Sequence, residues 1–142
     1  MTTASTTPTT SSAHTGLARV LADITTEREA QHAVWGVQHH LPDGTGPQWS
    51  ALANAVRQEC ERAAANGELT WRHVLFEEVA EALAENDPTR LRSELTQAGA
   101  VVAQWMQAID HRSLPANREG NTTTWPSPPN SCSPATAKPP AT

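Results

Sequence analysis

The chain has 142 residues, enough for one domain, and its composition excludes several classes of function. Its net charge of −5 argues against non-specific nucleic-acid binding, which requires a basic surface. Two cysteines, Cys60 and Cys132, are too few for a disulfide framework or a four-cysteine zinc site. No apolar run is long enough to span a membrane and no signal-peptide pattern occurs, so we expect a cytoplasmic protein without membrane partners.

The two ends of the chain differ in composition from the middle. Residues 1–15 contain ten Ser or Thr and no charged residue, and residues 113–142 hold seven of the eleven prolines. Neither end shows apolar periodicity, so neither buries enough surface to offset its loss of conformational entropy. We therefore predict disordered tails at 1–15 and 113–142 around one folded domain at 16–112. This domain has 14 acidic residues and 8 basic ones, all arginines, which excludes a P-loop lysine.

Apolar residues at helical spacing predict four helices with only weak strand signals, and hence an all-α fold. In chain order the helices are expected to cover residues 16–32, 49–66, 70–86 and 88–112. The stretch 36–47 contains three glycines and two prolines, which predicts an irregular loop between the first two helices.

Local start and stop signals mark the last three helices. Gly67 suits the C′ position after the second helix, and Thr70 is a good N-cap for the third. Asp87-Pro88 supplies an N-cap residue followed by proline at the first helical position of the fourth. Because the connection at residues 86–88 is so short, the third and fourth helices are expected to pack as an antiparallel hairpin.

Glutamates gather on the two helices of this hairpin. Glu78 and Glu81 are three residues apart and share one face of the third helix, with Glu85 one turn further along. Glu94 and Gln97 have the same spacing on the fourth helix, at a similar distance from the turn. We therefore expect carboxylates and one amide oxygen to converge between the two helices.

A convergence of carboxylates is costly without a cation, because the negative charges repel one another. Oxygen ligands favour hard ions, so Mg²⁺ is the expected cofactor and Mn²⁺ the alternative. A Mg²⁺ ion held by few carboxylates keeps open positions that phosphate groups can occupy. The competing interpretation is a plain one: glutamates three and four residues apart often form only a solvated helix face.

These residues resemble the MazG-like all-α nucleoside triphosphate pyrophosphohydrolases, which have ExxE and ExxD motifs on two antiparallel helices. Glu78-Val79-Ala80-Glu81 is similar to the first motif, and Glu94-Leu95-Thr96-Gln97 to the second. Two stretches further upstream resemble the family's ER..Q..KWG.Q.H segment. They are Glu27-Arg28-Glu29-Ala30-Gln31 and Val34-Trp35-Gly36-Val37-Gln38-His39-His40. The likeness spans roughly residues 23–112. Gln97 stands where the family has aspartate, and Val34 where it commonly has lysine.

The resemblance implies a four-helix MazG-like bundle, assembled as a homodimer or a higher homo-oligomer. It implies hydrolysis of a nucleoside triphosphate to a monophosphate and pyrophosphate. The implied metal ligands are Glu78, Glu81, Glu94 and Gln97, and the implied catalytic residues are Glu77 and Glu78.

Substrate contacts are expected around the upstream segment. Trp35, beside the glycine-rich loop, suits stacking on a nucleobase, and the loop histidines suit contacts to phosphate or sugar. By sequence neighbourhood, Arg28, Arg57 and Arg72 are candidates for phosphate, to which a guanidinium makes two parallel hydrogen bonds. The predicted substrate-binding set is Arg28, Gln31, Trp35, Gln38, His39, His40 and Arg72.

A second hypothesis belongs to a different class: a non-catalytic helical interaction or regulatory module that retains the same fold. Gln97 brings no charge to a metal site, and Val34 removes one phosphate contact, so both favour this hypothesis. A third hypothesis, a helical DNA-binding regulator, conflicts with the acidic composition of residues 16–112.

Overall fold

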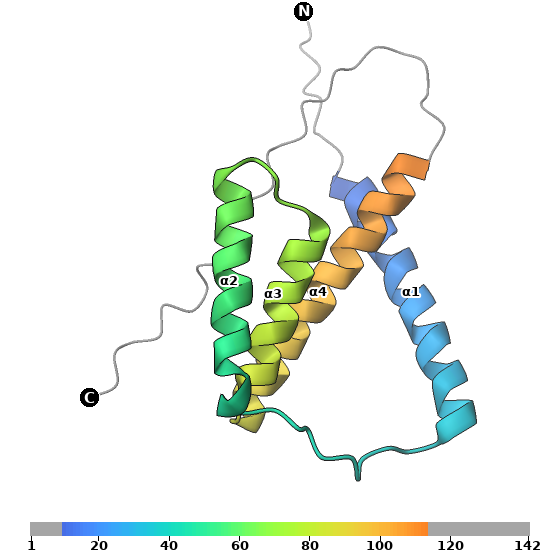
Figure 1. Ribbon diagram of the computed structural model, residues 1–142. Helices are drawn as coiled ribbons and strands as arrows, with labels where there is room; N and C mark the ends of the chain where they lie inside the picture. The colour runs from blue at the N-terminus through green and yellow to red at the C-terminus, as the bar shows by residue number, and fades with distance from the viewer. Residues whose placement is uncertain (1–9, 114–142) are drawn as a thin grey trace, which may run out of the picture. The chain divides into compact units, whose positions relative to one another are not determined.

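A computed structural model of the chain describes residues 10–113. These residues form four α-helices and one short 3₁₀ helix, η1, and no strand occurs among them, so the predicted all-α fold is confirmed (Figure 1). Most of the two predicted tails, residues 1–9 and 114–142, lies outside the described residues. The elements in chain order are α1 (Thr10–Trp35), η1 (Pro47–Trp49), α2 (Ser50–Ala65), α3 (Trp71–Ala84) and α4 (Pro88–Ser113).

The boundaries of α2, α3 and α4 agree with the predicted ones to within two residues. The boundaries of α1 do not, because this helix begins at Thr10 rather than at residue 16 and ends at Trp35 rather than at residue 32. The additional first turns consist mainly of Ser and Thr, which are weak helix formers, and the first turn has no acidic residue. The sequence therefore lacks a start signal at Thr10.

The described helices group into two compact units. The first unit contains residues 10–42 and 102–113, which are α1, the loop after it and the last part of α4. The second contains residues 43–101, which are η1, α2, α3 and the first part of α4. All the carboxylates predicted to converge belong to the second unit, so this unit by itself contains the candidate site.

In the first unit, most apolar side chains of α1 are exposed. Val20 is fully buried, whereas Leu17, Leu21 and Ile24 are exposed. Within residues 10–113, none of the helices combines the length and the apolar character needed to cross a bilayer.

The second unit is built on small side chains between α2 and α3. Ala80 of α3 is fully buried and packs with Ala53 and Val56 of α2. Cys60, also fully buried, continues the same face of α2 one turn after Val56. Small residues at a helix contact let the two backbones approach closely, so the neighbouring side chains of α3 are buried as well. Glu77 and Glu78 are two of these.

Replacing Ala80 by Leu is expected to destabilise the second unit by about 1–3 kcal/mol, because the larger side chain overpacks the contact with α2. Urea denaturation of the purified variant measures this loss. Ala55→Leu is the matched control, since Ala55 is an exposed residue of α2. Equal stability of the two variants would show that α2 and α3 are not closely packed at Ala80.

The turn between α2 and α3 follows the predicted stop signal. Gly67 has a φ of 71°, a left-handed conformation that glycine adopts without strain. Its N–H donates to the carbonyl of Ala64 at 3.1 Å, and the N–H of Glu68 donates to the carbonyl of Ala63 at 2.8 Å. This is the Schellman motif, which ends α2 and satisfies its last carbonyl groups.

Two carboxylates hold the turn between α3 and α4. Oδ1 of Asp87 accepts the N–H of Arg90 at 2.9 Å and caps α4, while Pro88 takes the first helical position, where no N–H donor is needed. Oε1 of Glu85 accepts the N–H groups of Asn86 and Asp87 at 2.8 and 2.9 Å, and Nη2 of Arg90 at 3.0 Å. The hydrogen bond from Asp87 is the main cause of the lowered pKa of Glu85. Glu85, expected on the face of the acidic cluster, therefore closes the turn instead.

Candidate metal centre

Three carboxylates meet between α3 and α4. Glu78 and Glu81 of α3 and Glu94 of α4 each offer one oxygen, and these oxygens lie within 4.8 Å of one another. The three-residue spacing on α3 and the short turn bring them together, as the sequence predicts. Opposite ligands of Mg²⁺ are about 4.2 Å apart, so small side-chain rotations gather the oxygens around one ion. The group can hold a metal ion, and we name Glu78, Glu81 and Glu94 the carboxylate cluster.

Glu78 is the most deeply buried member of the cluster. Its residue is only 5% exposed, and its Oε2 atom is buried with no hydrogen-bond partner among the described residues. Burial is the main cause that raises the pKa of Glu78 to about 7, and repulsion by Glu81, Glu77 and Glu94 adds to it. A buried acceptor without a donor is unusual in a folded protein, and a bound cation would satisfy it. This observation is independent of the spacing of the three oxygens.

Glu81 is held by an arginine from α2. Arg57 donates from Nη2 at 2.6 Å and from Nε at 3.2 Å, and both hydrogen bonds go to Oε1 of Glu81. The same hydrogen bonding is the largest cause of the raised pKa of Arg57. Because Oε1 takes both donors, Oε2 of Glu81 is left without a hydrogen bond from the described residues and can bind a cation.

Glu94 is supported from its own helix. Nε2 of Gln97 donates to Oε2 of Glu94 at 3.1 Å. Burial is the first cause of the raised pKa of Glu94, followed by the negative charges of Glu81 and Glu85. Gln97 therefore lies next to the cluster, with its amide nitrogen turned toward Glu94. Its role as a metal ligand stays a prediction.

Glu77 lies beside the cluster without belonging to it. Its residue is 4% exposed, and its charge helps to raise the pKa values of both Glu78 and Arg57. A buried acid next to three clustered carboxylates is suitably placed to act on a bound water, so its catalytic role also stays a prediction.

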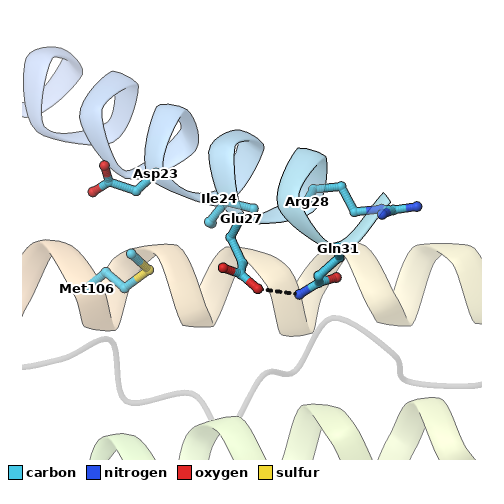
Figure 2. A pocket seen from close by; sticks show the side chains of 6 residues that line it. All are labelled: Asp23, Ile24, Glu27, Arg28, Gln31 and Met106. Carbon is cyan, nitrogen blue, oxygen red and sulfur yellow. Dashed lines mark hydrogen bonds between the residues drawn. The ribbon is translucent and has the colours of Figure 1, made fainter. Parts of the chain in front are cut away.

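The first unit contains a pocket of about 330 Å³. Two of the predicted substrate-binding residues, Arg28 and Gln31, line it, and the carboxylates of Asp23 and Glu27 were not anticipated there. Figure 2 shows Glu27 and Gln31 extending in the same direction from α1, with Nε2 of Gln31 donating to Oε1 of Glu27 at 2.9 Å. The Arg28 side chain extends along the helix, away from them. The complete lining is Asp23, Ile24, Glu27, Arg28, Gln31 and Met106.

The other upstream residues lie at the end of α1 and in the loop after it. Trp35, the last residue of α1, is 63% exposed, and its carbonyl accepts Nε2 of Gln38 at 2.6 Å. His39 and His40 are exposed loop residues. This exposure leaves all three rings accessible to a ligand, but no contact joins them into one site.

Arg72 is the one predicted substrate contact in the second unit. It lies in the first turn of α3, with Nη2 3.0 Å from Nε2 of His73. Glu78 comes six residues later, about 9 Å further along the helix axis. The structure therefore does not bring Arg72 against the carboxylate cluster, and Arg57 occupies that place.

Comparison of the chain with protein-family models, with curated proteins and with solved structures finds no match. The resemblance to the MazG-like pyrophosphohydrolases thus rests on the ExxE, ExxQ and upstream motifs of the sequence, and the function has to be argued from the site.

Proposed function

We propose that the chain is a metal-dependent nucleoside triphosphate pyrophosphohydrolase, with Mg²⁺ as its cofactor and Mn²⁺ as a substitute. The observation that supports this most strongly is the carboxylate cluster with the unpartnered buried oxygen of Glu78. An oxygen-only group of this kind selects hard divalent cations. The motif resemblance supplies the proposed reaction and the choice of Mg²⁺.

In the proposed reaction, Glu78, Glu81 and Glu94 would hold the divalent cation. A bound cation neutralises phosphate charge and lowers the pKa of a bound water. Glu77 accepts a proton from the water that attacks the α-phosphorus. The bond from this phosphorus to the bridging oxygen breaks, and pyrophosphate leaves with that oxygen. The products are a nucleoside monophosphate and pyrophosphate.

Product analysis by ion exchange tests this proposal. The protein is incubated with Mg²⁺ and a panel of canonical nucleoside triphosphates, and we expect monophosphate and pyrophosphate in equal amounts. Glu78→Gln removes a charged ligand and is expected to lower turnover at least about 1,000-fold, the scale of losing a main catalytic group. Glu68→Gln, at an exposed residue outside the cluster, is the control and should turn over as the wild type does. Nucleoside diphosphate as the product, or no product with either metal, would contradict the proposal.

A second candidate function is the non-catalytic helical module. Two observations favour it: Arg57 and Gln97 donate hydrogen bonds to two of the three clustered carboxylates, and such bonds compensate part of their charge. In such a module, Mn²⁺ would not stabilise the protein against heat. A metal-dependent rise in the unfolding temperature, lost in Glu78→Gln, separates the two candidates before any substrate is known. A homodimer or higher homo-oligomer, and the absence of nucleic-acid and membrane partners, stay predictions from the sequence.

A further inference from the structure

The guanidinium of Arg57 has more donors than its ion pair uses. An arginine side chain has five N–H donors in a fixed plane. Glu81 receives one from Nε and one from Nη2, both at Oε1. The side chain is 43% exposed, which leaves part of it open to a ligand. Arg57 thus contacts a candidate metal ligand and has N–H groups that Glu81 does not use.

The other arginines of residues 43–101 are not available in this way. Arg62 pairs with Glu59, Arg90 pairs with Glu85, and Arg72 lies against His73. Arg92 is exposed on α4 and has no ion pair with the cluster. Among the arginines in this part of the chain, Arg57 alone contacts a clustered carboxylate.

The negative charge around the cluster means that a nearby cationic group favours binding of an anionic substrate. Glu77 adds a fourth carboxylate to the three of the cluster. When all four carboxylates are ionised in the metal-loaded site, one divalent cation balances only half of their charge, so a phosphate chain would still meet a net negative site. A guanidinium in direct contact with Glu81 supplies further positive charge there.

We propose that Arg57 makes two contacts at once in the loaded site, and this inference rests on the proposed function. Through Oε1 it orients the Glu81 carboxylate, so that Oε2 binds the cation. With its remaining N–H groups it binds non-bridging oxygens of the substrate's phosphate chain. Arg57 is therefore a substrate-binding residue for phosphate and a positioning residue for the metal ligand.

Calorimetric titration with two probes, Mn²⁺ alone and then pyrophosphate in the presence of Mn²⁺, tests both roles. Arg57→Ala is expected to weaken pyrophosphate binding about 10- to 100-fold, the scale of one or two charge-assisted hydrogen bonds. Arg62→Ala is the matched control, since it removes an ion-paired arginine from the same helix. The positioning role predicts weaker Mn²⁺ binding in Arg57→Ala than in Arg62→Ala. If Arg57 only repelled the cation, its removal would tighten Mn²⁺ binding instead.

Equal pyrophosphate affinity of the Arg57→Ala and Arg62→Ala proteins would overturn the inference. If the wild type still binds Mn²⁺ in that case, the proposed metal site is unaffected. Failure of the wild type to bind Mn²⁺ would overturn both proposals. Should Arg57→Ala not fold, Arg57→Lys provides the comparison, because it keeps the charge but has one ammonium in place of the planar donor set. We expect weakened pyrophosphate binding in Arg57→Lys, and wild-type affinity would count against the inference.

Discussion

Glu78→Gln is expected to make the metal-free protein more stable at pH 8 by about 3 kcal/mol, and also to abolish the proposed activity. This figure follows from a pKa of about 7 in the folded protein against 4.5 for an ordinary glutamate. At pH 8 the wild type has to keep a buried negative charge beside other carboxylates. Glutamine has nearly the same shape and no charge, so this cost disappears. A substitution that raises stability and removes function is typical of residues in functional sites.

The contribution of Glu78 to the free energy of unfolding depends on pH. Because the folded protein holds the Glu78 proton more tightly than the unfolded chain, the stabilisation is fully present below about pH 4.5 and is lost as the pH rises to about 7. The raised pKa of Glu94 acts in the same direction. Urea denaturation in EDTA between pH 5 and 8 should therefore show wild-type stability falling, with Glu78→Gln falling much less. Parallel curves for the two proteins would contradict the assignment of this decline to Glu78.

Gln97→Asp is expected to tighten Mn²⁺ binding about 10- to 100-fold, the scale of changes to groups that support metal ligands. The substitution removes the donor that now faces Glu94 and adds a carboxylate within reach of the cluster. The same charge should lower the stability of the metal-free protein, because it repels the clustered carboxylates. Metal binding and metal-free stability thus change in opposite directions.

Titration calorimetry with Mn²⁺ and urea denaturation in EDTA measure the two effects of Gln97→Asp. Gln104→Asp makes the same change at an exposed residue of α4 and is the control. If Gln97→Asp and Gln104→Asp bind Mn²⁺ equally well, position 97 does not belong to the metal site.

The parts of the fold that the sequence predicted well depend on neighbouring residues. Gly67, Thr70 and Asp87-Pro88 each act within one turn of their own position, so their chemistry is visible in the sequence. The convergence of Glu78, Glu81 and Glu94 could also be predicted from the sequence, because it depends only on the helical repeat and a short turn. The start of α1 was missed because the first turns are rich in Ser and Thr, which are weak helix formers, and contain no acidic residue.

The parts that the sequence did not reveal depend on distant contacts or on competition between partners. Arg57 and Glu81 are 24 residues apart, and their pairing follows from the packing of α2 on α3. Sequence neighbourhood offered Arg28, Arg57 and Arg72 as phosphate candidates and left Arg57 out of the predicted substrate-binding set. In the structure, Arg57 is the one of these three that contacts a clustered carboxylate. Glu85 has the helical spacing of a cluster residue, but its carboxylate accepts hydrogen bonds from the N–H groups of the turn and from Arg90 instead.

Because Cys60 is buried, the reactivity of its thiol measures how often the structure around it opens. Cys60 has no accessible surface, so a thiol-specific reagent reaches its thiol only when the structure around it opens. With Cys132 replaced by Ser, the labelling rate divided by that of an unfolded control gives the fraction of molecules that are open. Labelling over a series of Mn²⁺ concentrations then reads out how strongly a cation between α3 and α4 restrains α2, without any engineered probe.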